Sequence, residues 1–163
     1  MKLLAWNCQG PSPPWTVHTL KELIQLHRPD LVFLSETKCK ARRCDRVKNL
    51  VNYNGVGVFY VGKGGVLLLL WRNDLDVWLQ SFSSHHIDVT VKSEECPERW
   101  RFIGFYGYPE VGNRKEGWTL LRKLAQQSVR QWICAGDFKY CISKRNKEVS
   151  LGLIGKCEIS ENV

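Results

Sequence analysis

A strand–helix–strand pattern occurs twice in the sequence, once at its start and once after residue 100. In the first unit we predict a strand at Lys2–Cys8, a helix at Thr16–His27 and a strand at Leu31–Leu34. The second unit repeats this order at Trp100–Tyr106, Glu116–Gln127 and Gln131–Ala135. Because such crossovers are right-handed, the two strands of each unit should be parallel. The pattern therefore predicts an α/β chain with two parallel strand pairs.

A polar residue follows or ends each of these four strands. The strands of the first unit end at Asn7 and Glu36, and those of the second unit end at Tyr106 and Asp137. The carboxyl ends of parallel strands share one edge of a sheet, where functional sites of α/β folds lie. A single acid after a strand is usually a turn former or a helix cap. Two acids in equivalent places of two similar units favour a functional site at a common rim.

Between the two units, short apolar runs separated by turn residues predict a block of β-strands. We place these strands near Val56–Val61, Val66–Trp71, Asp76–Leu79 and Ile87–Val91. The segment Gly62–Gly65 lacks the G-K-[ST] ending and the following helix of a phosphate-binding loop, so we interpret it as a hairpin turn. The segment Lys38–Asn54 is basic and polar, and no secondary structure is assigned to it.

The chain is strongly basic, with 24 Lys and Arg against 16 Asp and Glu and a net charge of +8. This excess favours a polyanionic partner, with nucleic acid as the first candidate, although a merely soluble basic protein fits the charge equally well. Six basic residues lie in the segment Lys38–Lys48, just after Glu36. This segment is either a solvated loop or a track of phosphate contacts. The candidate contacts in it are Lys38, Arg42 and Arg43.

The cysteines and histidines indicate a reduced protein without a zinc site. The seven cysteines include no C-x-x-C pair, and the four histidines have no ligand spacing to a cysteine pair. We interpret His85 and His86 as structural. With no signal peptide evident and no apolar stretch long enough to cross a bilayer, we expect a soluble intracellular protein without a membrane partner. Nucleus or cytoplasm, and the oligomeric state, are left open.

Four segments carry a resemblance to a known family. They are Leu4–Gly10 (LAWNCQG), Pro29–Thr37 (PDLVFLSET), Gly104–Gly107 (GFYG) and Ala135–Phe138 (AGDF). They resemble successive motifs of the endonuclease/exonuclease/phosphatase superfamily, which includes abasic-site endonucleases and pancreatic-type deoxyribonuclease. In detail the chain is similar to the amino-terminal endonuclease domain of plant LINE-type (non-LTR) retrotransposons. That similarity extends to Gly65–Trp71, His86–Asp88 and Gly104–Glu110, and the whole resemblance covers about residues 2–138.

The resemblance implies a fold and a site. The fold is an α/β (α+β) four-layer sandwich, here incomplete, with two β-sheets face to face and helices outside. Glu36 matches the metal-binding glutamate, for Mg²⁺ or Mn²⁺, and Asn7 the asparagine that orients this ligand and the phosphate. Tyr106 matches a tyrosine that stabilises charge on the scissile phosphate. Asp137 matches the aspartate that positions or activates the attacking water.

The sequence departs from the family pattern at its end. Lys139 stands where the family has an asparagine; it keeps a donor and is a further candidate phosphate contact, but it is longer and can crowd the metal. We expect a partial family domain at residues 1–141 and a divergent, basic and poorly ordered tail at residues 142–163. No histidine follows His86 in the 163 residues, so the histidine of the family's Ser-Asp-His motif has no counterpart.

These observations leave three functions in competition. The first is a Mg²⁺-dependent DNA endonuclease by descent, C-terminally truncated and impaired by the missing histidine. The second is a retrotransposon remnant that binds nucleic acid without catalysis. The third is a phosphoesterase of the same superfamily that acts on a small molecule. The basic charge and the LINE-like segments favour the first two, and whether the chain is an active enzyme is left open.

Overall fold

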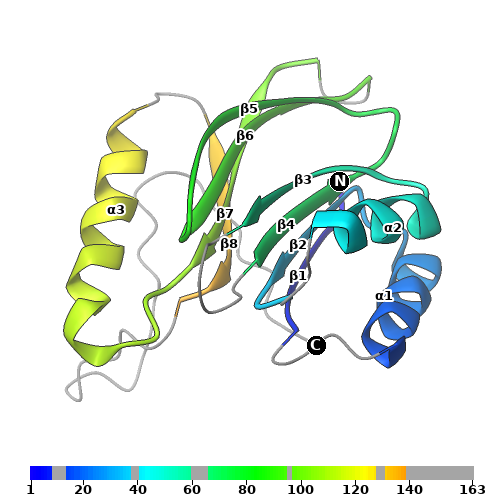
Figure 1. The fold of residues 1–163 in the computed structure, drawn as a ribbon. Coiled ribbons are helices and arrows are strands. Elements are labelled where there is room, and N and C mark those ends of the chain that lie inside the picture. The colour runs from blue at the N-terminus through cyan, green and yellow to red at the C-terminus, as the bar shows by residue number, and fades with distance from the viewer. Residues whose placement is uncertain (9–13, 38–40, 60–65, 95–96, 128–130, 139–163) are drawn as a thin grey trace.

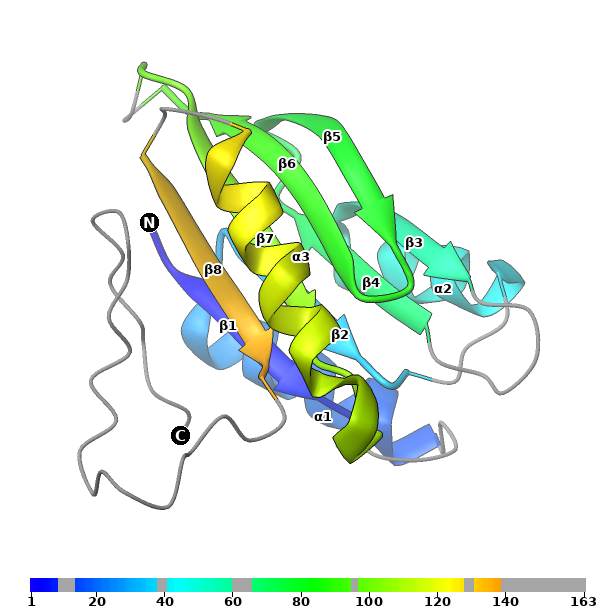
Figure 2. The same ribbon diagram turned by 90° about the vertical axis from the view of Figure 1, so that its left-hand side faces the viewer.

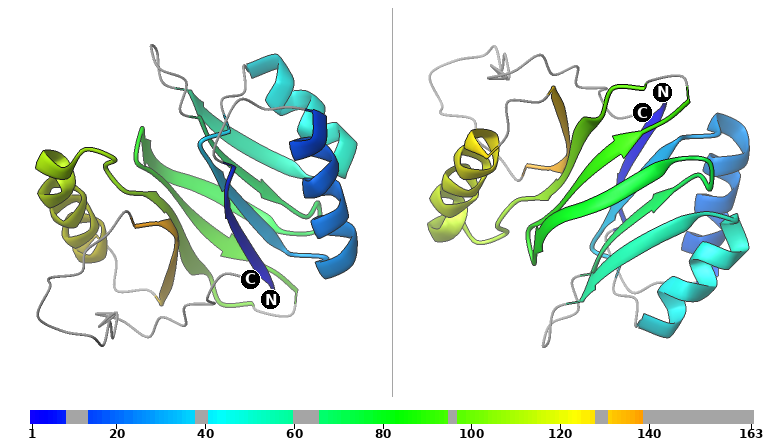
Figure 3. Two further views of the ribbon diagram at one scale, coloured as in Figure 1. Left: turned by 90° about the horizontal axis from the view of Figure 1, so that it is seen from below. Right: turned by 90° about the horizontal axis from the view of Figure 1, so that it is seen from above.

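The computed structural model describes residues 1–8, 14–37, 41–59, 66–94, 97–127 and 131–138. Two four-stranded β-sheets pack face to face, and helices cover the outer face of each (Figure 1). Seen from below and from above, the order of the layers is helices, sheet, sheet and helix (Figure 3). The predicted α/β sandwich is therefore confirmed.

The first sheet contains the first strand–helix–strand unit and has the strand order β1-β2-β4-β3. Its strands are β1 (Leu3–Asn7), β2 (Leu31–Ser35), β3 (Asn54–Phe59) and β4 (Val66–Trp71). The crossover helix α1 (Pro14–His27) joins β1 to β2, and these two strands are parallel, as predicted. The other two pairings are antiparallel. A proline at the first helical position leaves no unsatisfied N–H there, which explains why α1 begins two residues before the predicted start.

The second sheet contains the second unit and has the strand order β5-β6-β7-β8. Its strands are β5 (Asp76–Ser83), β6 (His86–Lys92), β7 (Trp100–Tyr106) and β8 (Trp132–Asp137). A 3-10 turn (Val111–Asn113) and helix α3 (Arg114–Gln126) connect β7 to β8, which are parallel. Strand β5 continues to Ser83, past its predicted end, after a β-bulge that follows Leu79.

The two sheets approach closely at the strands that lead to the polar rim. The ring of Phe33 on β2 lies over Gly104 on β7, where an added Cβ would come within 2.3 Å of a ring atom. The same ring makes an edge-on contact with Phe102, with the ring centroids 6.4 Å apart. Only glycine at position 104 leaves room for this packing. The contact therefore sets the distance between the two parallel strand pairs.

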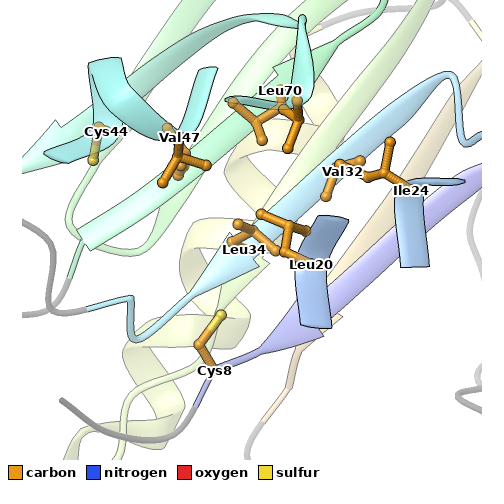
Figure 4. Packing of buried hydrophobic residues seen from close by; sticks show 10 residues of the cluster. Cys8, Leu20, Ile24, Val32, Leu34, Cys44, Val47 and Leu70 are labelled. Atoms are coloured by element: carbon orange, nitrogen blue, oxygen red, sulfur yellow. The ribbon is translucent and has the colours of Figure 1, made fainter. Parts of the chain in front are cut away.

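The outer layers are held by apolar contacts between helices and sheets. Leu20 and Ile24 of α1 and Val47 of helix α2 (Ala41–Val51) are buried against the first sheet (Figure 4). On the other side, Leu121 and Leu124 of α3 pack on the second sheet. Each such side chain removed from water contributes about 1.5–3 kcal/mol to folding.

Helix α2 lies in the basic segment to which the sequence assigned no structure. Its buried face consists of Cys44, Val47 and Val51, and its other face carries exposed Arg42 and Arg46. Three apolar residues at helical spacing are a weak signal among six basic ones. Tertiary packing against the first sheet, and not local propensity, stabilises this helix.

A buried ion pair connects β6, β7 and α3. The guanidinium of Arg101 donates two hydrogen bonds of 2.8 Å to the carboxylate of Asp88 and one of 2.7 Å to the carbonyl of Leu124. Both charged side chains are almost completely buried. The Leu124 carbonyl lies in the last turn of α3 and also accepts a bond of 3.2 Å from the Gln127 amide, so Arg101 uses the second lone pair of this oxygen.

At one side of the sandwich, β1 and β8 lie side by side (Figure 2). Within the described residues each of these two strands pairs with one neighbour only. The predicted turn at Gly62–Gly65 and the predicted tail at residues 142–163 lie outside the described residues. None of the helices in the described ranges is long and apolar enough to cross a membrane.

Candidate active site

The four predicted site residues meet where the two parallel strand pairs end. Asn7 is in register with Ser35 in the first sheet, and Tyr106 is in register with Asp137 in the second. Asn7 Nδ2 donates a hydrogen bond of 2.5 Å to Asp137 Oδ2, and the Tyr106 hydroxyl donates one of 2.8 Å to Glu36 Oε1. Both bonds cross from one sheet to the other. The rim is therefore a single polar cluster built equally by the two units.

An unusual backbone conformation places Glu36 at this rim. Its φ is +54°, a left-handed conformation that is uncommon for a residue other than glycine. The flanking Ser35 and Thr37 are buried, and Ser35 continues the strand ladder by accepting a bond of 2.9 Å from the Cys8 amide. The chain thus turns sharply between two anchored residues. Strain of this kind is concentrated at functional sites because the surrounding structure must maintain it.

A glycine allows Asp137 to lie beside Tyr106. Gly136 has a φ of +145°, and a Cβ there would lie 1.9 Å from the carbonyl oxygen of Phe105. The strand ladder extends past Gly136, because the Gly107 amide donates a bond of 2.6 Å to the Asp137 carbonyl. The glycine of the AGDF motif is therefore required by the close approach of β7 and β8.

The environment of Tyr106 keeps its hydroxyl protonated. Burial raises the pKa of the Tyr106 phenol, and its hydrogen bond to Glu36 and the negative charges of Glu36 and Asp137 raise it further. Ionisation would place a phenolate beside two carboxylates in a partly buried site. Tyr106 is thus a hydrogen-bond donor throughout the physiological pH range.

The donors at the rim have the chemistry that Mg²⁺ requires. Two carboxylates (Glu36 and Asp137) and one amide (Asn7) supply oxygen ligands, and Mg²⁺ uses one or two protein carboxylates while it keeps waters and substrate phosphate as its other ligands. In the described part of the chain no group of three or more His, Cys, Asp or Glu could hold a metal ion. The carboxylate and amide oxygens present are hard donors of the kind that suits Mg²⁺ or Mn²⁺.

Of the predicted phosphate contacts, the structure describes the side chain of Arg42 only. Arg42 is exposed on α2, which begins shortly after Glu36. Arg43 is also in α2, but its side chain, like all of Lys38 and Lys139, lies outside the described residues. The roles of all the predicted site residues stay predictions.

A pocket beside the rim was not anticipated from the sequence. Gly107 and Phe138, which follow Tyr106 and Asp137, line it together with aromatic residues and Arg114. Among the described residues, Arg114 Nε is the one buried side-chain nitrogen or oxygen atom without a hydrogen-bond partner. Such an atom requires a water or a ligand group. No local sequence signal distinguishes Arg114 from the other basic residues of the chain.

The fold and this rim define an α/β-sandwich protein with an acidic site at the common end of its two sheets. The chain belongs to the Endonuclease/Exonuclease/phosphatase family, whose model matches residues 4–138. A sequence search of the curated proteins finds no match.

Solved structures with the same fold include enzymes of several kinds. The human Nocturnin catalytic domain superposes with a TM-score of 0.66 at 14% identity, over 86% of this chain and 64% of that one. A mannosyl-6-phosphatase of Bacteroides thetaiotaomicron gives 0.64 at 15%, over 85% and 65%. The endonuclease domain of TRAS1, a telomere-specific non-LTR retrotransposon, gives 0.64 at 15%, over 85% and 60%. The chain thus spans less than two thirds of each, and at these identities the likeness establishes the fold alone.

Proposed function

We propose that the rim is a divalent-metal-dependent phosphodiesterase site that acts on nucleic acid, with DNA as its first substrate, as in LINE-type endonuclease domains. The observation that carries the proposal is the pair of cross-sheet hydrogen bonds, Asn7 to Asp137 and Tyr106 to Glu36. These bonds bring together two acids, an amide and a protonated phenol, which are the groups that phosphodiester hydrolysis requires.

Each residue of the rim has a distinct part in the proposed reaction. Glu36, with Asn7 beside it, would hold the metal ion, which when bound offsets negative charge on the phosphate oxygens. Asp137 would accept the proton of the attacking water as the new oxygen–phosphorus bond forms and the bond to the leaving strand breaks, and the leaving oxygen would take its proton from solvent water. Tyr106 donates a hydrogen bond to a phosphate oxygen as negative charge develops there.

Charge supports a nucleic-acid substrate. The net charge of +8 includes Arg42 and Arg46, which are exposed one turn apart on α2. Because α2 begins shortly after Glu36, a phosphate backbone at the rim would pass close to these guanidinium groups. The endonuclease domain of TRAS1 shares the fold, so the fold is compatible with this substrate class.

A small-molecule phosphoesterase is the second candidate. The mannosyl-6-phosphatase superposes as well as the TRAS1 domain does, with the same TM-score of 0.64. Fold similarity therefore favours neither substrate over the other, and the choice of DNA depends on charge.

A plasmid-nicking assay on the full chain, with and without Mg²⁺, tests the proposal. Because the histidine of the family's Ser-Asp-His motif has no counterpart in the 163 residues, we expect slow nicking that requires Mg²⁺ and falls at least about 100-fold in Glu36→Gln. Glu22→Gln, at an exposed position of α1, is the matched control and should leave nicking unchanged. Hydrolysis of mannose 6-phosphate without nicking would favour the second candidate. DNA binding without hydrolysis of either substrate would favour the hypothesis of a non-catalytic remnant that binds nucleic acid.

A further inference from the structure

The turn between β5 and β6 contacts the end of β7 through one residue, His85. The Tyr106 amide donates a hydrogen bond of 2.8 Å to the His85 carbonyl, and His85 Nδ1 lies 2.9 Å from the Tyr106 carbonyl oxygen. The turn itself is fixed by Ser83, whose Oγ accepts a bond of 3.1 Å from the His85 amide. The backbone and the side chain of His85 therefore both bind the backbone of Tyr106.

The side-chain bond fixes the protonation of one ring nitrogen. A carbonyl oxygen only accepts hydrogen bonds, so Nδ1 of His85 must carry the proton that lies between them. Nδ1 is therefore the donor and the Tyr106 carbonyl the acceptor of this bond.

The imidazole ring also stacks on two tyrosines of the same strand end. The rings of His85 and Tyr108 are 3.6 Å apart between centroids and inclined by 12°. The rings of His85 and Tyr106 are 6.1 Å apart and inclined by 8°. Three nearly parallel rings restrict the direction in which the Tyr106 phenol extends towards Glu36.

The neighbouring His86 has a different part. It is buried, and its two ring nitrogens bond to the hydroxyls of Ser81 and Ser83 at 3.0 and 2.8 Å. Both of its polar atoms are thus used within the β5–β6 hairpin. Of the two adjacent histidines, it is His85 that contacts the rim.

We propose that His85 is a positioning residue for Tyr106, which it holds through the Nδ1–carbonyl bond so that the hydroxyl meets Glu36. This inference rests on the proposed function only for its consequence in catalysis. The geometric effect on Tyr106 is independent of any reaction. It can therefore be measured on the full chain without metal or DNA.

The test uses NMR of the chain with ¹³Cζ-labelled tyrosine at neutral pH. Tyr106→Phe assigns the Tyr106 signal, and Glu36→Gln gives its position when the charged partner of the hydroxyl is lost. An asparagine amide reaches about as far as Nδ1 and keeps the donor to the carbonyl, whereas the longer glutamine amide does not match it. We expect the signal near its wild-type position in His85→Asn and displaced towards the Glu36→Gln position in His85→Gln and His85→Ala.

His18→Ala is the control variant. His18 is exposed on α1, which covers the first sheet, so this variant gives the baseline for loss of a histidine far from Tyr106 in the fold. The inference is overturned if Tyr106 gives the same signal in His85→Asn and His85→Gln. These two polar variants keep the test decisive even if His85→Ala does not fold. If nicking is observed, His85→Gln should lower kcat roughly 10- to 100-fold with little change in KM, and His85→Asn should retain most of kcat. If the chain does not nick DNA but the His85 variants show the displaced signal, the proposed function fails and this inference stands.

Discussion

At the scale of single residues, the rim depends on backbone conformations as much as on side chains. Glu36 is in a left-handed conformation at φ +54°, and Gly136 is at +145°, where the oxygen of Phe105 leaves no room for a Cβ. These two positions direct the carboxylates of Glu36 and Asp137 to the same edge. A substitution that changes either backbone should disturb the site without removing a polar group.

Gly136→Ala should therefore lower the free energy of unfolding by about 2 kcal/mol or more, because the added methyl group collides with Phe105 and the residue resists this φ. Gly112→Ala is the matched control, since nothing lies within 4 Å of its Cβ position. Urea unfolding of the two variants measures the difference. Equal stability of the two would contradict the account of β8.

The raised pKa of Tyr106 predicts a particular dependence of stability on alkaline pH. Above the ordinary tyrosine pKa of about 10, the unfolded chain has lost the phenolic proton while the folded chain still binds it. This contribution to stability is complete below about pH 10 and is lost as the pH rises further. Stability measured between about pH 9 and 11 should fall less steeply in Tyr106→Phe than in the wild type. Parallel curves would show that Tyr106 is not held protonated.

At the scale of elements, the strands were predictable because their apolar runs are continuous, whereas α2 was not. The observed β1, β2, β4 and β7 agree with the predicted ranges to within about two residues. Among its described side chains, helix α2 buries only Cys44, Val47 and Val51, so packing against the sheet stabilises it more than its local sequence pattern does.

Sequence patterns also indicated which residues end at the rim, but not how they pair. The bonds of Asn7 to Asp137 and of Tyr106 to Glu36 cross between sheets, and the relative orientation of two sheets is not encoded in either strand's local sequence. For the same reason the sequence did not predict the contact of His85 with Tyr106. Its partner Tyr106 lies 21 residues away along the chain.

The ion pair of Asp88 and Arg101 is the element-scale contact with the largest expected effect on stability. Asp88→Asn would leave a buried guanidinium without its counter-charge, at a cost of about 3–5 kcal/mol. The exposed pair of Arg72 and Asp74 is the control, and Asp74→Asn should change stability little. Thermal unfolding compares the two variants. Comparable small losses would show that the buried pair is not needed to join β6, β7 and α3.

At the scale of the whole molecule, both sheets contribute residues to the rim, and exposed Arg42 and Arg46 lie on α2, which begins shortly after Glu36 in the chain. If DNA passes over this helix, Arg42→Gln/Arg46→Gln should weaken DNA binding and reduce the slope of log K against log salt by about 2. Arg122→Gln/Lys123→Gln removes the same charge from exposed positions of α3, on the opposite outer layer. A salt titration of binding to a short duplex distinguishes the pairs. Equal losses would indicate nonspecific attraction by net charge.

Residues of both sheets build the proposed divalent-metal site at the rim. Adding substoichiometric Mn²⁺ to the ¹³Cζ-tyrosine-labelled chain tests this site, because the paramagnetic ion broadens nearby signals. Tyr53 is an internal reference, since its hydroxyl bonds to Pro29 at the opposite end of β2 from Glu36. We predict that the Tyr106 signal broadens while that of Tyr53 stays sharp, and that Glu36→Gln abolishes the effect. A sharp Tyr106 signal in the wild type, or equal broadening in Glu36→Gln, would contradict the claim.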